Sequence, residues 1–186
     1  MSDSDQQRLE DAQQRLSDCE ELVSSAQLAS IYDRLAAQSA QDLQGLSPLV
    51  LCVMVGGLYA TAEVTRRWGF AHDLGYLHAT RYRGATSGGE LHWKAPPSHA
   101  VRGRHVLIID DILDEGTTLV AIQEALRAEQ PASVRTLVTC SKSHQRRDPR
   151  AQADYIGIEL PDRYLLGAGM DYHEAHRQYD RILALP

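Results

Sequence analysis

The chain has 186 residues, of which 43% are hydrophobic, and a formal net charge of −6 at pH 7. This length predicts one compact domain spanning residues 1–186, while the negative charge excludes nucleic acid as a default partner and favours small molecules. The three cysteines form no CxxC pair, which predicts free thiols in the cytoplasm, and no apolar run is long enough to predict membrane attachment.

Residues 1–45 are predicted to form two helices before the first strand. Apolar residues recur at spacings of three and four from Leu9 to Val23, which predicts one amphipathic helix over that range. Ser24 and Gln27 match a capping box that would open a second helix. The expected buried face of that helix carries Leu28, Ile31, Tyr32 and Leu35.

Residues 46–153 are predicted to form the core sheet. The continuous apolar run at 49–55 and the largely apolar segments at 105–110 and 134–140 are typical of buried strands, and helical patterns follow the first two. Strands that are apolar throughout and separated by helices indicate an α/β fold, with a parallel sheet covered on both faces. Residues 82–99 are rich in Gly, Ser and Pro, so a mobile loop or an extended hairpin is expected there.

The sequence VLIIDDILDEGTTL (106–119) combines acidic and hydroxyl residues between a strand and a helix. Ligands of open parallel sheets bind beyond the carboxyl ends of the strands, where Asp110 and Asp111 are expected. Two adjacent carboxylates there should face sugar hydroxyls, a hydrated Mg²⁺ or a basic side chain. The turn from Asp114 to Thr118 opens a helix, whose free N–H groups could hold a phosphate monoester. Together these features describe a site for a sugar phosphate.

A structural interpretation exists for each part of this stretch. Asp110 and Asp111 could merely end a strand, and Asp114 could merely cap the helix that follows. Either part alone favours that interpretation. Their order, after a buried strand and before a helix, favours a functional site.

The stretch VLIIDDILDEGTT resembles the signature that binds 5-phosphoribosyl 1-pyrophosphate (PRPP) in type I phosphoribosyltransferases. From about Leu46 to Leu183 the chain is similar to the hypoxanthine-guanine phosphoribosyltransferase family. MVGG (54–57) resembles the pyrophosphate loop of that family, and RY (81–82) resembles the start of its flexible loop. Lys142 and the segment 154–172 resemble the parts that contact the purine.

This resemblance implies a type I phosphoribosyltransferase-like fold, with a parallel sheet, flanking helices, a flexible active-site loop at about 82–99 and a small hood from the chain termini. Residues 154–186 would supply the base-binding part of the hood. The implied function is purine salvage. The 5-phosphoribosyl group of PRPP would pass to hypoxanthine and/or guanine, giving IMP or GMP and pyrophosphate, with Mg²⁺ as cofactor. A homo-dimer or homo-tetramer is also implied.

The resemblance implies a role for each matching residue. Asp114 would be the general base at purine N7, which is reasonable because a nearby carboxylate can accept a proton as positive charge builds on the base. Asp110 and Asp111 would serve the ribose hydroxyls and, with Asp171, the metal. The 5'-phosphate would contact Asp114, Glu115, Gly116, Thr117 and Thr118, and the pyrophosphate would contact Val55, Gly56, Gly57 and Arg177. The purine would contact Lys142, Tyr164, Leu165 and Asp171. Arg81 and Tyr82 would belong to the flexible loop.

Three residues depart from the family pattern. Val55 replaces a common lysine of the pyrophosphate loop, so backbone donors or another cation must serve there. Arg81 replaces a serine, and Glu115 replaces a small hydroxyl residue of the phosphate turn. Because an anion beside a phosphate is repulsive, we predict that the Glu115 side chain points to solvent and that only its N–H faces the phosphate.

Two other classes of function compete with this interpretation. A non-catalytic regulator on the same fold would bind PRPP or a nucleotide and act through RNA or a protein, but the presence of Asp114 disfavours it. A basic face formed by Arg146, Arg147 and Arg150 would favour that regulator. An aspartyl phosphatase or a dinucleotide-binding enzyme has little support, because the chain shows neither DxD spacing of these acids nor a GxGxxG after a strand.

Overall fold

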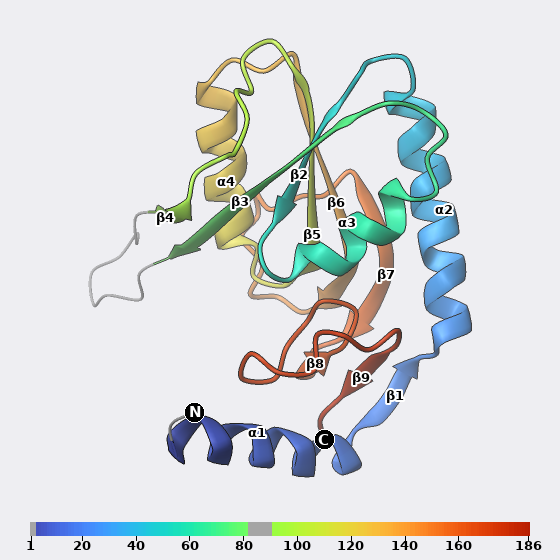
Figure 1. Cartoon of the computed structure of the whole chain (residues 1–186), viewed down its shortest axis with the longest axis vertical. Coiled ribbons are helices and arrows are strands. Elements are labelled where there is room, and N and C mark those ends of the chain that lie inside the picture. The colour runs from blue at the N-terminus through green and yellow to red at the C-terminus, as the bar shows by residue number, and fades with distance from the viewer. Residues whose placement is uncertain (1–2, 82–90) are drawn as a thin grey trace.

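The computed structural model describes residues 3–81 and 91–186, and its centre is a six-stranded sheet (Figure 1). The strand order is β4-β3-β2-β5-β6-β7, and neighbours are parallel except for the antiparallel pair β3 and β4. The bounds are β2 Leu49–Val53, β3 Asp73–Arg81, β4 Leu91–Ala95, β5 His105–Leu113, β6 Ser133–Ser143 and β7 Tyr155–Pro161. The predicted α/β class is confirmed.

The central strand β5 has apolar side chains on both of its faces because both faces are covered. Val106 and Ile108 belong to a core cluster shared with α4 (Thr117–Ala128). Leu107 and Ile109 belong to the opposite cluster, which includes residues of α2 (Ser25–Leu43) and α3 (Gly57–Thr65). Successive side chains of a strand point to opposite faces, so a sheet covered on both faces buries them all.

The second predicted helix begins where the capping box places it. Ser24 Oγ accepts the N–H of Gln27, and the Gln27 side chain accepts the N–H of Ser24. A cap of this kind stabilises a helix by about 1 kcal/mol. The four apolar residues predicted on its inner face are buried.

The first predicted helix is wrong beyond residue 15. Helix α1 covers Asp3–Arg15, a 3₁₀ turn η1 covers Leu16–Asp18, and Glu20–Val23 form strand β1. Ser17 Oγ donates to the Gln14 carbonyl, and local bonds of this kind compete with helix continuation. Strand β1 pairs with β9 (Ile182–Ala184) near the opposite end of the chain, a partner that local periodicity cannot reveal.

The hood is a three-stranded antiparallel sheet in the order β1-β9-β8, where β8 is Leu165–Leu166. It therefore draws on segments near both chain termini, as predicted. Figure 1 shows it, together with α1, at the end of the molecule where the parallel strands finish. No helix in the described part of the chain is long and apolar enough to cross a membrane.

Other boundaries also differ from the predictions. The strand predicted at 49–55 stops at Val53, while the one predicted at 105–110 continues to Leu113. Asp110 pairs with Val138 and so lies within β5 instead of ending it. Residues 91–95 form a hairpin strand against β3, and the rest of the predicted loop up to residue 90, including Tyr82, lies outside the described residues. Strand β7 belongs to the main sheet although it falls within the segment expected to form the hood.

Candidate active site

Asp110 and Asp111 lie near the carboxyl end of β5, beside the loop that follows β2. The N–H of Asp111 donates to Asp110 Oδ1 at 2.9 Å, and Asp111 is only 9% exposed. A Cβ atom at Gly56 would lie 2.1 Å from Asp111 Oδ2, so only glycine fits at this point of the loop. The Asp111 carboxylate is therefore pressed against the predicted pyrophosphate loop.

This pair of carboxylates is electrostatically unfavourable by itself. Burial raises the pKa of Asp110 well above its ordinary value, and repulsion from Asp111 adds to the rise. Burial also raises the pKa of Asp111, and Arg177 offsets only part of the effect. Two hard oxygen donors in this state would be stabilised by a bound divalent cation such as Mg²⁺.

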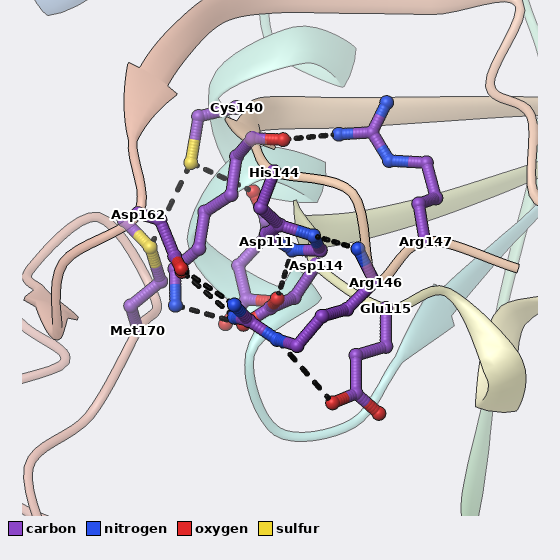
Figure 2. Close-up of polar contacts among 10 residues, drawn as sticks. Asp111, Asp114, Glu115, Cys140, His144, Arg146, Arg147, Asp162 and Met170 are labelled. Carbon is purple, nitrogen blue, oxygen red and sulfur yellow. Dashed lines mark hydrogen bonds and ion pairs between the residues drawn. The ribbon is translucent and has the colours of Figure 1, made fainter.

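Asp114 lies three residues further on and has the opposite environment (Figure 2). Its Oδ2 accepts a hydrogen bond from Lys142 Nζ at 2.7 Å, and its Oδ1 lies 2.6 Å from His144 Nε2. Burial pushes the pKa of Asp114 upward, but these two hydrogen bonds outweigh burial and leave the pKa below its ordinary value. Asp114 is thus an ionised carboxylate that could accept a proton.

The turn after Asp114 forms a cavity at the start of α4. Gly116 has a φ of 75°, and a Cβ atom there would lie 2.3 Å from the Cβ of Ala151, so the turn requires glycine. The cavity has a volume of about 280 Å³. Its lining residues are Asp110, Ile112, Asp114, Glu115, Gly116, Thr117, Thr118 and Leu119. Free N–H groups at a helix start are suited to an anion.

A second cavity of about 250 Å³ brings together the residues predicted to contact the purine. Its lining residues are Asp111, Ile112, Asp114, Lys142, Tyr164, Leu165, Met170 and Asp171. Tyr164 is 48% exposed and meets Tyr172 edge to face with ring centroids 5.6 Å apart, so it is not a core residue. Ile112 and Asp114 line both cavities, which places Asp114 between them.

The segment that follows β8 meets the predicted pyrophosphate loop at a contact between two glycines. A Cβ atom at Gly169 would lie 2.1 Å from the carbonyl oxygen of Gly56. Arg177 donates to the Gly169 carbonyl and pairs with Asp171, each at 2.7 Å. Asp171 and Arg177 thus lie close to residues 55–57, while the Val55 side chain is exposed.

Glu115 has the predicted orientation. Its side chain is 58% exposed and lies 4.0 Å from Arg146 Nε, and Figure 2 shows it extending away from Asp114. Arg146 also binds both carboxylate oxygens of Asp162. Arg150 binds Asp148 and Glu124. Of the three arginines named in the sequence analysis, Arg146 and Arg150 are thus paired with acids, while Arg147 donates to the backbone carbonyl of Lys142.

His144 is the member of this group that the sequence analysis missed. It stands two residues after Lys142 at the end of β6, and this spacing places both side chains on one face of an extended segment. Asp114, His144 and Asp162 approach within 4.8 Å of one another. Lys142 and Arg146 already bind the two carboxylates, so this cluster disfavours a metal ion.

Comparisons with known proteins agree with this geometry. Residues 18–172 match the model of the phosphoribosyl transferase domain, which begins well before the resemblance predicted from about Leu46. The hypoxanthine-guanine phosphoribosyltransferase of Staphylococcus aureus (strain Mu50) is 30% identical over 164 residues, 88% of this chain and 91% of the relative. The hypoxanthine-guanine-xanthine phosphoribosyltransferase of Tritrichomonas foetus is 28% identical over 143 residues, 77% and 78% of the two chains.

Solved structures extend the likeness to the whole architecture. The crystal structure of a hypoxanthine phosphoribosyltransferase from Staphylococcus aureus superposes with a TM-score of 0.83 at 26% identity. The superposition covers 90% of this chain and 91% of that one. The chain therefore belongs to the phosphoribosyltransferase family, within its hypoxanthine-guanine branch.

Proposed function

We propose that the chain is a purine-salvage enzyme that transfers the 5-phosphoribosyl group of PRPP to hypoxanthine and/or guanine. The products are IMP or GMP and pyrophosphate. The observation that carries this proposal is the position of Asp114 between two cavities, one at a helix start suited to phosphate and one bounded by Lys142 and Tyr164. The ribose then lies at the junction of the cavities, with the purine N7 proton near Asp114.

The proposed chemistry relies on the ionised state of Asp114. As the purine attacks the ribose carbon, positive charge builds on the base, and Asp114 takes the proton from N7. Lys142 donates to the purine O6, which favours oxopurines over aminopurines. Tyr164 stacks on the base, and the backbone of Leu165 reads its edge.

The phosphate groups of PRPP are held at two places. The N–H groups from Glu115 to Thr118, with the threonine hydroxyls, bind the 5'-phosphate. The N–H groups of Val55, Gly56 and Gly57, together with Arg177, bind the pyrophosphate. In this proposal Arg81, at the end of β3, and Tyr82 belong to the flexible loop.

Mg²⁺ is the proposed cofactor. Asp110, Asp111 and Asp171 offer the hard oxygen ligands that Mg²⁺ prefers, and the raised pKa values of the first two fit a site that receives a cation. When bound, the ion would neutralise the charge that develops on the leaving pyrophosphate.

The remaining parts of the proposal concern organisation and location. Residues 1–186 act as one domain, in which the hood covers the core sheet. The enzyme assembles as a homo-dimer or homo-tetramer. All three cysteines are free thiols, which supports a reducing compartment such as the cytoplasm.

A nucleotide-synthesis assay tests the function directly. Purified protein, PRPP and Mg²⁺ are incubated in parallel with hypoxanthine, guanine, xanthine and adenine, and nucleotide and pyrophosphate are measured. Product is expected with hypoxanthine or guanine and not with adenine, and EDTA should abolish it. Absence of product from every oxopurine would refute the proposal, while the xanthine reaction reports discrimination at purine C2.

A further inference from the structure

His144 is a buried side chain placed directly against the proposed base. Its side chain is 4% exposed, and its Nε2 lies 2.6 Å from Asp114 Oδ1. The other ring nitrogen, Nδ1, accepts the backbone N–H of Arg146 at 3.1 Å. Because Nδ1 accepts a bond, the proton of a neutral imidazole must be on Nε2, where it can be donated to Asp114.

The two oxygens of Asp114 therefore have different partners. Oδ1 meets a rigid, buried imidazole, while Oδ2 meets the ammonium of Lys142 at the end of a flexible stem. The proposed function needs that ammonium for the purine O6. When Lys142 turns to the substrate, Oδ2 loses its donor and Oδ1 keeps its own.

We propose that His144 is a positioning residue for Asp114: it fixes Oδ1 through a neutral Nε2–H and leaves Oδ2 as the oxygen that receives the N7 proton. This inference rests on the proposed function, because it assumes that Asp114 is the base. In this arrangement, binding of the purine O6 by Lys142 and release of Oδ2 are one movement.

The loop after β6 holds His144 in this position. Arg146 supplies the N–H that binds Nδ1, and its guanidinium is fixed by two hydrogen bonds to Asp162. Arg147 donates to the backbone carbonyl of Lys142. The charged groups near Asp114 and His144 in the described chain include Lys142, Arg146, Asp162 and Glu115.

The test compares two substitutions that differ in one donor. His144→Leu removes the Nε2–H, whereas His144→Gln keeps an N–H at a similar distance along the side chain. We expect His144→Leu to lower kcat about 10-fold or more, because hydrogen bonds to charged groups are the strong ones, with the KM for PRPP within about twofold. His144→Gln should recover kcat to within about threefold of wild type.

The pH profile of kcat gives a readout that a merely structural role would not move. Loss of the Nε2–H donor removes a group that stabilises the ionised carboxylate, so the pKa of Asp114 should rise. The acid limb of kcat should therefore move to higher pH in His144→Leu and return in His144→Gln. His105→Leu is the matched control, because His105 bonds Ser133 at the opposite end of β5 and should leave the limb in place.

Several results would overturn the inference. Either an unchanged kcat in His144→Leu or a rise in its KM for PRPP that parallels the fall in kcat would do so. So would a His144→Gln enzyme as slow as His144→Leu. Additive losses of kcat in a double-mutant cycle of His144→Leu with Asp114→Asn would also overturn it. If His144→Leu does not fold, nitrogen NMR of the wild-type imidazole still decides, since a protonated Nδ1 would refute it. Wild-type turnover by Asp114→Asn would instead refute the base role in the proposed function.

Discussion

Two groups of carboxylates at one end of β5 have opposite environments. Asp110 and Asp111 are packed together, with Asp111 buried and Asp110 half-buried, and their pKa values are raised. Asp114 is bonded by Lys142 and His144, and its pKa is lowered. Groups whose environments push their pKa values apart have different tasks in an active site. The first pair is suited to receive a cation, and Asp114 is suited to take a proton.

The largest expected effect concerns the second group. Asp114→Asn keeps the shape of the side chain but cannot accept the N7 proton, so kcat should fall by about 10² to 10⁴. PRPP affinity, measured by calorimetry, should stay within about threefold of wild type. Turnover close to wild type would show that the opposite environments of the acids do not reflect different tasks.

Displacement of the first group should have the next largest effect. The Cβ atom added by Gly56→Ala would collide with the Asp111 carboxylate, although the backbone of Gly56 is in an ordinary helical conformation. A shift of a catalytic group by about 1 Å can cost about 10²-fold in rate, so kcat/KM should fall by that order. Gly69→Ala is the matched control, because its Cβ atom meets no atom within 4 Å. Equal losses in both variants would contradict the steric argument.

A smaller effect, on thermal stability, is expected from a substitution in the first group of carboxylates. Asp110→Asn removes a half-buried charge next to the Asp111 carboxylate, so without Mg²⁺ and PRPP the variant should melt at least about 2 °C higher. The same variant should bind PRPP and Mg²⁺ more weakly. Calorimetric melting with and without ligands measures both, and a lower melting temperature without ligands would contradict the proposed strain.

The pH dependence of this stability has a defined sign. The pKa values of Asp110 and Asp111 are raised in the folded state, so protonation of the pair favours folding. The contribution is present below the pKa values of the unfolded chain and is lost as pH rises through the raised folded values. The melting advantage of Asp110→Asn over wild type should therefore grow from acidic to neutral pH. A difference in melting temperature that shrinks as pH rises would contradict the raised pKa values.

The smallest effect is expected at Glu115, the fourth acidic residue of segment 106–119. The Glu115 side chain is exposed, and its contact with Arg146 is a surface ion pair worth at most about 1 kcal/mol. Glu115→Gln should therefore change the KM for PRPP by less than about fivefold. A change above tenfold would mean that the carboxylate reaches the bound phosphate.

The sequence could predict what depends on local pattern. Apolar runs located β2, β5 and β6, the capping box located the start of α2, and the order of acids and threonines around β5 located the site. These features depend on residues that are close together in the sequence, because strand burial, helix capping and a phosphate turn each involve only a few consecutive positions.

Long-range pairing was beyond the reach of local pattern. Val23 continued the periodicity of the first helix, yet it belongs to β1 because a strand from the other end of the chain pairs with it. His144 gave no signal by itself, since its importance comes from Asp114, which directly follows the neighbouring strand β5. The pKa shifts, likewise, depend on which charges the fold brings together.

The pairing of β1 with β9 has a consequence for the order in which the enzyme matures. Leu165 pairs with Ala184 in β9, which in turn pairs with Glu20 in β1. Strand β1 is synthesised before the main sheet and β9 after it, so β1 must wait for nearly the whole chain before its partner exists. The phosphate turn can form within the growing sheet, but the purine pocket closes only at the end. A nascent chain should thus acquire its turn for the 5'-phosphate before it can recognise a base.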